Sequence, residues 1–314
     1  MPGLEIQPFS EEHLGRAAEL LAQRHRRHRE AEPLLSDPAD YRAEVEALWR
    51  GDQASGVVGL RDGRIAGYVL GISKDEGPWG PNVWVDPAGH AVEQAEDLRD
   101  LYAVAAVDWV EQGRTRHYAL APASDAPLLE AWYRLSFGQQ QALGIREIPV
   151  AAMPDNVRPA EERDVEALVE LGPMLSDYQG GSPVFSAWRA LETEEELRQE
   201  VIDDLANSEL GLLVAEVDGR VVGGFELAPT TLSPMHVSLA RVEGAVLLGW
   251  AVTRPDVRGS GAGVALTEAC FAWAREHGYE VMVTDWRVTN LLSSRFWPRR
   301  GFRETFLRLY RSIP

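Results

Sequence analysis

The stretch Arg258-Gly259-Ser260-Gly261-Ala262-Gly263 lies where an apparent strand gives way to an apparent helix. Before it, Leu247 to Val252 form an apolar run that suits a buried strand. From Ala262 onward the apolar residues recur at helical spacing. Its glycines permit positive φ and bring backbone N–H groups close to a ligand. Because the first N–H groups of a helix lack internal partners and carry partial positive charge, the stretch predicts an anion-binding turn that suits a diphosphate.

Other classes of glycine loop fit this sequence less well. A P-loop ends in Gly-Lys-Ser/Thr, and the one lysine of the chain, Lys74, lies far from the stretch. A dinucleotide-binding fingerprint needs a third glycine where the chain has Val264, although Asp285 lies at a suitable distance beyond it. Taken alone, the loop also leaves open that its glycines form a tight surface turn and nothing more.

A second motif follows the loop at a fixed distance. Asn290 precedes Trp297 by seven residues and Gly301-Phe302 by eleven and twelve. Together with the Arg-x-x-Gly-x-Gly pattern of the loop, this arrangement resembles the GNAT superfamily of acyl-CoA-dependent N-acetyltransferases. The motifs cover about fifty residues, and the order of expected elements extends the resemblance over residues 157–314.

The chain also contains an internal repeat, for which its 314 residues leave room. Residues 55–71 parallel residues 211–227, and each segment predicts a strand, a turn and a strand. Residues 132–137 align with residues 297–302 at an offset of 165. The chain is therefore expected to hold two copies of one fold.

The resemblance implies the α+β fold class for both copies. We expect two GNAT-like domains, each with a central mixed, mostly antiparallel β-sheet flanked by α-helices. Residues 1–150 form the first domain, and residues 151–314 form the second, catalytic domain that binds acyl-CoA.

The two copies differ in the residues that matter for an acyl-CoA. Opposite the glycine loop, residues 93–98 contain no glycine and three carboxylates. Asp125 replaces Asn290, and Ser136 replaces Gly301. Residues 1–150 are therefore expected to be a degenerate copy that serves as a scaffold, a wall of the acceptor pocket or a dimer surface.

For the second copy, the resemblance implies an N-acetyltransferase that uses acetyl-CoA as cosubstrate. The acetyl group would pass to a primary amine of a small molecule or peptide by direct attack in a ternary complex. The strand ending at Val252 is expected to splay from the strand ending at Thr284, so that pantetheine enters the gap and a backbone N–H polarises the thioester carbonyl. The expected acetyl-CoA-binding residues are Ala251, Val252, Arg258, Gly259, Ser260, Gly261, Ala262, Gly263, Asn290, Ser293 and Trp297.

The general base has several candidates. The resemblance points to Asp285, because some family members carry a glutamate at that place. Capping of the next segment, or pairing with Arg287, would explain Asp285 equally well. Glu226, Glu243 and His236 are reserve candidates, since each lies on or near strands expected to border the acceptor site.

The chain departs from the family pattern at Trp297, where a tyrosine often protonates the leaving thiolate. Indole has no group that titrates in the useful range. A water or Tyr310 would then supply the proton, or the thiolate would leave unassisted, as a thiol pKa near 8.5 permits. The departure keeps an alternative function open, that of a CoA-binding regulatory or scaffold protein without turnover.

The composition limits the binding partners and the cellular compartment that we expect for this chain. The net charge of −18 argues against nucleic acid and anionic membranes and is compatible with a cationic acceptor. The acidic runs Glu194 to Glu196 and Asp203-Asp204 are expected to be helix-surface residues, although the resemblance places this segment where the family shapes its acceptor pocket. The single cysteine, Cys270, allows no internal disulfide, which favours the cytoplasm. The sequence shows no metal-binding pattern and no membrane span, and either a monomer or a homodimer is expected.

Overall fold

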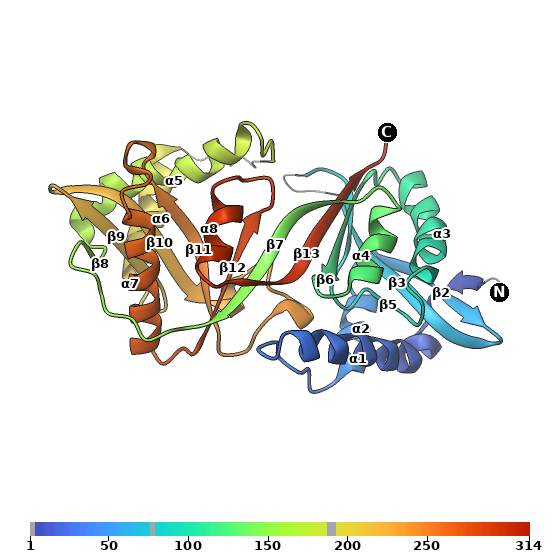
Figure 1. Cartoon of the computed structure of the whole chain (residues 1–314). Helices are drawn as coiled ribbons and strands as arrows, with labels where there is room; N and C mark the ends of the chain where they lie inside the picture. Colours follow the sequence, from blue (N-terminus) through green and yellow to red (C-terminus); the bar gives the residue numbers. More distant parts are fainter. Residues whose placement is uncertain (1–3, 76–78, 187–192) are drawn as a thin grey trace. The chain divides into compact units, whose positions relative to one another are not determined.

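The structure is a computed structural model that describes residues 4–75, 79–186 and 193–314 (Figure 1). It divides into two compact units. Unit 1 contains Met1–Leu143, Met235–Arg241 and Glu304–Pro314, and unit 2 contains Gly144–Pro234 and Val242–Arg303. Each unit combines a β-sheet with α-helices, so the predicted α+β class is confirmed.

The first half of the chain supplies most of unit 1. Its elements are β1 (Glu5–Pro8), η1 (Glu11–His13), α1 (Leu14–Ala31), α2 (Tyr41–Trp49), β2 (Ala54–Arg61), β3 (Arg64–Lys74), β4 (Asn82–Val85), β5 (His90–Val92), α3 (Asp97–Glu111), β6 (Arg116–Pro122), α4 (Ala126–Tyr133) and β7 (Gly138–Glu147).

The second half repeats this order. Its elements are β8 (Val157–Pro159), η2 (Glu162–Asp164), α5 (Val165–Gly180), α6 (Glu194–Ala206), β9 (Gly211–Val217), β10 (Arg220–Pro229), η3 (Thr230–Leu232), η4 (Ser238–Ala240), β11 (Val246–Thr253), η5 (Pro255–Val257), α7 (Ala262–Glu276), β12 (Val281–Arg287), α8 (Ser293–Arg299) and β13 (Arg303–Ser312).

The internal repeat predicted from the sequence is visible in these bounds. Three pairs of elements, α3 with α7, β6 with β12 and β7 with β13, begin and end 165 residues apart. The first hairpins also match, because Asp62 and Asp218 both precede a glycine and have φ of 52° and 53°. Asp and Gly tolerate the left-handed region that such a tight hairpin turn requires.

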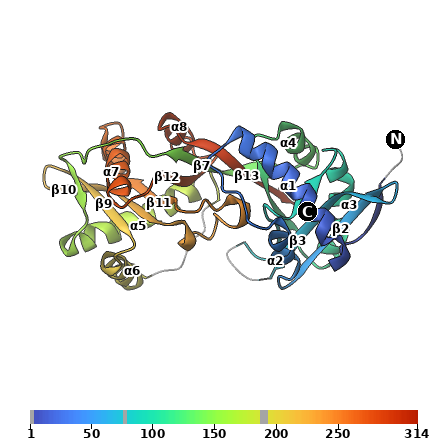
Figure 2. The same cartoon turned by 90° about the horizontal axis from the view of Figure 1, so that it is seen from below.

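The strand pairing within each unit is mixed. In unit 1 the strands run in the order β1-β2-β3-β4-β6-β13, with only the β4–β6 pair parallel. In unit 2 the order is β12-β11-β10-β9-β8, with only the β11–β12 pair parallel. Helices α5 and α6 cover one side of the unit 2 sheet, and α7 covers the other (Figure 2).

The last strand of each repeat lies largely or partly in the unit that the other repeat forms. Strand β13, which ends the second repeat, pairs antiparallel with β6 from Phe306–Pro122 to Ser312–Arg116 and so completes the sheet of unit 1 (Figure 1). The end of β7, from Gly144 onward, belongs to unit 2. The division at residue 150 between a degenerate and a catalytic domain stays a prediction about function.

Unit 1 has an unusual number of histidines in its core. His28, His90 and His117 are almost fully buried. The His90 ring contacts the carbonyl oxygen of Leu120 at 3.0 Å, and the His28 ring lies 4.7 Å from that of Phe306. Burial lowers the pKa of His28 and His90 to about 3 and that of His117 to about 4. All three are therefore neutral in the folded protein near pH 7.

The residues described contain no helix long and apolar enough to cross a bilayer. The same residues contain no group of three or more His, Cys, Asp or Glu side chains placed to hold a metal ion.

The buried histidines predict acid instability of unit 1. An unfolded histidine gains a proton below about pH 6.5, whereas the folded one does not, so stability falls as the pH drops below 6.5. Each histidine contributes a slope of up to about 1.4 kcal/mol per pH unit. Urea unfolding at pH 7.5, 6.5, 5.5 and 4.5 measures this loss, and His117→Gln should reduce the slope. A free energy of unfolding that stays constant from pH 6.5 to 4.5 contradicts the assignment.

Candidate functional site

The two parallel strands of unit 2 separate part of the way along their length. Strands β11 and β12 pair from Val246–Met282 to Leu248–Thr284, and both continue beyond that point. The hydroxyl of Thr284 donates to the carbonyl oxygen of Leu248 at 2.9 Å, at the last pair. Beyond it, β11 still pairs with β10 along one edge, from Trp250 to Thr253. Its other edge is therefore left open by β12, as the resemblance led us to expect.

A β-bulge marks the same place. Strand β10 pairs Glu226 with Trp250 and Leu227 with Leu248, so that Gly249 is the extra residue of β11. A bulge bends a strand and re-aims its side chains. The carboxylate of Glu226 lies beside this point, since a Cβ built on Gly249 would be 3.8 Å from its Oε1. The bulge therefore brings a carboxylate to the start of the open edge.

The glycine loop connects the open end of β11 to α7. Gly259 and Gly261 have φ of 87° and 97°, and a Cβ on either would meet open space. In the part of the chain that the structure describes, the N–H groups of these two glycines have no hydrogen-bond partner. Helix α7 begins directly afterwards at Ala262. The loop therefore presents unpaired donors at a positive helix end, which is the arrangement that binds anions.

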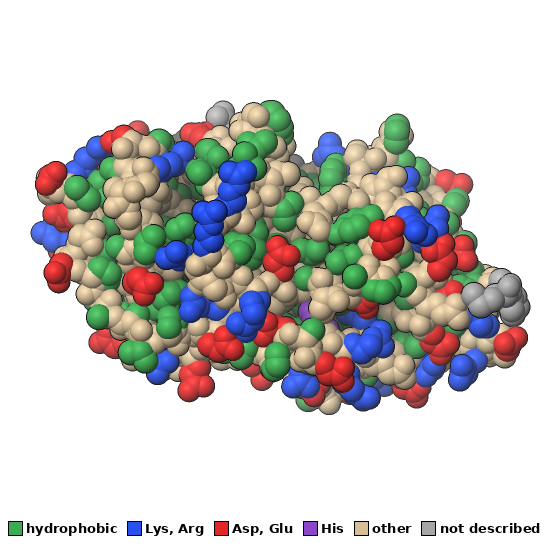
Figure 3. All heavy atoms as spheres, in the orientation of Figure 1, with side chains coloured by type: hydrophobic (Ala, Val, Ile, Leu, Met, Phe, Trp, Pro, Cys, Tyr) green, Lys and Arg blue, Asp and Glu red, His purple; other side chains and the backbone are tan. Residues whose placement is uncertain are grey.

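Basic side chains lie next to this loop. Helix α8 packs against the start of α7, because a Cβ built on Gly263 would lie 3.7 Å from the Phe296 ring. Exposed arginines at positions 295 and 299 belong to the same helix, and Figure 3 shows basic side chains on the surface over α8. The guanidinium of Arg258 lies 5.1 Å from the Tyr178 ring centroid on α5. Positive charge is thus concentrated here in a chain that is acidic as a whole.

Asn290 has a structural partner that the sequence did not reveal. Its Oδ1 accepts hydrogen bonds from the N–H groups of Leu292 and Ser293 at 3.0 and 3.1 Å, and so caps α8. The matching residue of the first copy, Asp125, caps α4 in the same way by accepting from the N–H of Leu128. Capping therefore explains why an oxygen-bearing side chain occurs at this position in both copies.

Trp297 lies in the core of unit 2. Its side chain is buried, and its ring lies 6.0 Å from Phe225, 4.9 Å from Phe296 and 5.6 Å from Phe302. The hydroxyl of Ser293, one turn earlier, is buried with no hydrogen-bond partner within the described ranges. The expected roles of Trp297 and Ser293 in binding acetyl-CoA stay predictions.

The four candidate bases lie in different surroundings. Asp285 is half-buried near the end of β12, just beyond the last strand pair. Glu243 is exposed in the turn before β11. His236 is buried and belongs to unit 1 with residues 235–241. Glu226 is half-buried beside the bulge, and over the described residues its carboxylate forms no hydrogen bond or ion pair.

The environment of Glu226 keeps a proton on it at an unusually high pH. Burial, together with the carboxylates of Asp204 and Glu200 on α6, raises the pKa of Glu226 to about 7. Burial also raises the pKa of Asp204, with a contribution from Asp203. Sequence reasoning treated Asp204 as part of a surface run. The spacing of four residues from Glu200 to Asp204, which places both on one helix face, was the available signal.

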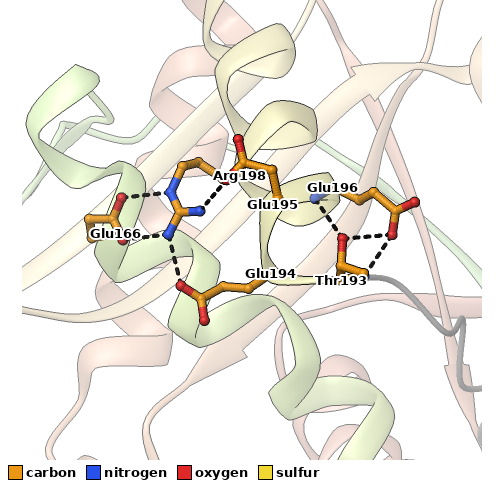
Figure 4. A network of polar contacts seen from close by, with 6 residues as sticks. All are labelled: Glu166, Thr193, Glu194, Glu195, Glu196 and Arg198. Atoms are coloured by element: carbon orange, nitrogen blue, oxygen red, sulfur yellow. Dashed lines mark hydrogen bonds and ion pairs between the residues drawn. The ribbon is translucent and has the colours of Figure 1, made fainter.

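The acids in the first turn of α6 have local partners. The guanidinium of Arg198 binds Glu166, Glu194 and Glu195 at 2.8 to 3.1 Å, and Thr193 and Glu196 form a capping box at the start of the helix (Figure 4). Arg198 is therefore committed to these three carboxylates. The acidic run from Glu194 to Glu196 serves the helix, as the sequence suggested for surface residues.

The loop of the first copy is occupied by its own ion pairs. Glu93 accepts from Arg16 at 2.6 Å, and Asp97 accepts from Arg61 at 2.6 Å at the start of α3. Carboxylates thus lie at the helix end where the second copy has unpaired N–H groups. The expectation that the first copy is degenerate stays a prediction.

The chain resembles known proteins in sequence and in fold. Residues 181–302 match the family described as Acetyltransferase (GNAT) family, and no curated protein sequence matches the chain. A GCN5-related N-acetyltransferase from Sphaerobacter thermophilus has a TM-score of 0.58 and 15% identity over 99% of this chain and 96% of its own. A tandem GNAT protein from the clavulanic acid biosynthesis pathway has a TM-score of 0.51 and 15% identity over 98% of each chain. An acetyltransferase of the GNAT family from Colwellia psychrerythraea has a TM-score of 0.51 and 11% identity, covering 99% of this chain and 100% of its own.

The cap on α8 leads to a test of what Asn290 does. Asn290→Ala removes the oxygen that accepts from two N–H groups and should lower the free energy of unfolding by about 1 kcal/mol. Asn290→Asp keeps that oxygen and should be close to the parent protein in urea unfolding. If instead both variants unfold like the parent and both bind acetyl-CoA more weakly in calorimetry, the residue acts on the ligand rather than on the helix.

Proposed function

We propose, from the match of residues 181–302 to the acetyltransferase (GNAT) family, that this chain is an acetyl-CoA-dependent N-acetyltransferase with its active site in unit 2. The observation that carries the proposal is the open edge of β11 between Gly249 and Thr253, with Glu226 at one end and the glycine loop at the other. Strand β11 thus runs from the Glu226 carboxylate to the anion-binding glycine loop.

The cosubstrate is expected to lie along this edge. Its diphosphate would accept hydrogen bonds from the N–H groups of Gly259 and Gly261, with Arg258 supplying a full charge nearby. An N–H of Ala251 or Val252 would donate to the thioester carbonyl and stabilise the negative charge that develops there during attack. The divergence of the strands supports this placement, because an edge already paired with β12 would have no donor to offer.

We propose Glu226 as the general base for the acceptor amine. An alkylammonium must lose its proton before it attacks, and a base with a pKa near the working pH does this best. The pKa of Glu226, raised to about 7, meets that condition, and its carboxylate lies beside the open edge. Asp285 is the second candidate. The amine would then attack the thioester carbonyl directly, forming the amide bond as the carbon–sulfur bond breaks.

The leaving thiolate needs no acid from Trp297, which is buried among aromatic rings. A thiol with a pKa near 8.5 departs as thiolate and takes a proton from water near neutral pH. Tyr310, the other proton donor considered for the thiolate, lies on β13 in unit 1.

The charges around Glu226 favour a cationic acceptor. Asp204 is half-buried, raises the pKa of Glu226 and, over the described stretches, has no ion-pair partner. An acceptor primary amine on a small molecule or peptide with a second positive charge would compensate this carboxylate. A panel of diamines and monoamines, assayed for free thiol released from acetyl-CoA, tests this expectation. Binding of acetyl-CoA without thiol release for any amine would support the alternative of a CoA-binding regulatory or scaffold protein.

The loop assignment predicts the effect of a charge at its second glycine. Gly261→Glu places a carboxylate and a side chain with φ of 97° where the diphosphate is expected, and should weaken acetyl-CoA binding at least about tenfold. Calorimetric titration measures this change. Gly219→Glu is the matched control, because Gly219 also has positive φ and open space around it but lies in the β9–β10 hairpin. Equal binding by Gly261→Glu and the parent protein would refute the loop assignment.

The base assignment predicts a pH profile. Because Glu226 must be ionised to accept a proton, kcat/KM should rise with pH up to about 7 and then level off as far as this group is concerned. Glu226→Gln should lower kcat/KM by about a hundredfold or more and abolish the step near pH 7. Asp285→Asn, measured in parallel by loss of the thioester absorbance, should retain that step. The assignment fails if the step follows Asp285→Asn instead.

A further inference from the structure

Unit 1 contains a buried arginine whose charge has no acidic partner among the residues that the structure describes. Arg308 lies on β13 and is 1% exposed. Its Nε and Nη2 atoms have no hydrogen-bond partner within the described residues. Within the described residues, its Nη1 atom donates to the sulfur of Met235, at 3.6 Å. A guanidinium removed from water in this way is costly unless something else compensates it.

Two other arginines of unit 1, Arg24 and Arg61, have oxygen acceptors for part of their guanidinium groups. Arg24 donates to the carbonyl oxygens of Pro87 and His90. Arg61 pairs with the carboxylate of Asp97 at 2.6 Å. Asp86, the residue directly after β4, interacts electrostatically with Lys74. Arg24 and Arg61 thus each have oxygen acceptors, whereas Arg308 has no oxygen acceptor among the described residues.

Aromatic rings surround the Arg308 guanidinium. It lies 5.6 Å from the ring centroid of Trp79 and 5.7 Å from that of Trp84. Trp84 stacks on Tyr118 at 4.5 Å, and Tyr118 lies 5.0 Å from Tyr310. These last three residues are directly paired across β4, β6 and β13, so they form one row on one face of the sheet. Trp79 and Tyr310 are half-exposed, and through them the row reaches the surface.

The unpaired groups in this cluster are all donors. Besides the two nitrogens of Arg308, the indole N–H of Trp84 is buried and has no acceptor among the described residues. The Nε and Nη2 atoms of a guanidinium lie on one edge, and their two N–H bonds match the two oxygens of a carboxylate. What the cluster lacks is therefore an acceptor that carries negative charge, preferably one with two oxygens in a plane.

We propose that unit 1 has a binding site for an aromatic carboxylate at this cluster. The half-exposed Trp79 side chain moves aside on binding, so that the carboxylate accepts two hydrogen bonds from the Nε and Nη2 groups of Arg308, and the attached ring packs against the side chains of Trp79 and Tyr310. Such a ligand supplies both the missing negative charge and an apolar surface that complements the rings. The site would be a ligand-binding function of the copy that has no glycine loop.

The repeat shows where this cluster lies in the shared fold. At the offset of 165, Leu120 of β6 corresponds to Asp285 of β12, and Tyr118 lies two residues before Leu120 on the same face of its strand. Arg308 pairs with Leu120. The cluster therefore occupies the sheet face that carries Asp285 in the other copy. It is independent of the glycine loop, so the proposal does not rest on acetyl transfer.

Arg308→Met gives the decisive test. Replacing a buried, uncompensated charge by an apolar side chain of similar length should raise the melting temperature of the unliganded protein. The same variant should bind benzoate at least about tenfold more weakly than the parent chain, because two charge-assisted hydrogen bonds are lost. Benzoate, with benzamide as the uncharged probe and inorganic phosphate as the non-planar anion, is titrated by calorimetry against the full-length chain.

Two controls separate this site from a general effect of charge. Arg311→Met removes an arginine of the same strand, whose guanidinium lies 5.8 Å from the Tyr102 ring, and should leave benzoate binding unchanged. The shift in melting temperature caused by acetyl-CoA should persist in Arg308→Met, which shows that the variant is folded. The proposal is overturned if the parent protein binds benzoate no better than benzamide or phosphate. It is also overturned if Arg308→Met binds benzoate like the parent or is destabilised.

Discussion

The end of parallel pairing between β11 and β12 is the constraint on which the candidate site depends. The pairing stops at Leu248 and Thr284, where the Thr284 hydroxyl holds the carbonyl of Leu248 at 2.9 Å. The bulge at Gly249 bends β11 at the next residue. A strand that kept its parallel partner would have no free backbone groups along this edge. The open edge, the position of Glu226 and the direction in which β11 enters the glycine loop all follow from this point.

Comparison of the two copies distinguishes residues that maintain the fold from residues that suit binding of the cosubstrate. Asp125 and Asn290 both cap the following helix, and Ser136 and Gly301 both have positive φ, of 63° and 84°. These positions maintain one turn in both copies, whether or not a cosubstrate binds. The loops, by contrast, have opposite charge, since residues 93–98 bring carboxylates that are neutralised by arginines. The second part of the motif, Asn290 and Gly301, is therefore explained by a turn that both copies share. The glycine loop is the part of the motif that differs between the copies and that suits an acyl-CoA.

Sequence reasoning found the features that depend on local backbone chemistry. The Asp-Gly turns, the glycine loop before Ala262 and the constant offset of 165 each follow from residues close together in the chain. The placement of β13 in the sheet of unit 1 could not be found in this way. Because β7 and β13 are equivalent strands of the repeat, their hydrophobic patterns do not specify which copy of β6 or β12 each should join.

Side-chain environments were the other feature beyond the reach of the sequence. Glu226 stood as a reserve candidate because nothing near it in the chain reveals that α6 brings Asp204 within electrostatic reach. Asn290 was expected to contact the cosubstrate because its spacing fits the family, and this stays a prediction; the structure adds that its oxygen caps α8. The Glu226 environment depends on packing between elements, which the spacing of residues along the chain does not reveal. The Asn290 cap is local, and an asparagine shortly before the helix was a signal that could have been used.

The treatment of charge in this chain links the two proposed sites. Arg198 satisfies three carboxylates, and Arg61 satisfies Asp97, so the fold pairs its charges where pairing serves stability alone. Glu226 and Arg308 are exceptions of opposite sign: both are removed from water, and over the described residues neither has a charged partner. Since an isolated charge lowers stability, a chain keeps one only if some other requirement outweighs the cost. A protonatable carboxylate that faces an open strand edge suits a cationic amine, and a guanidinium enclosed by aromatic rings suits a carboxylate. The same physical argument therefore assigns a ligand of complementary charge to each unit.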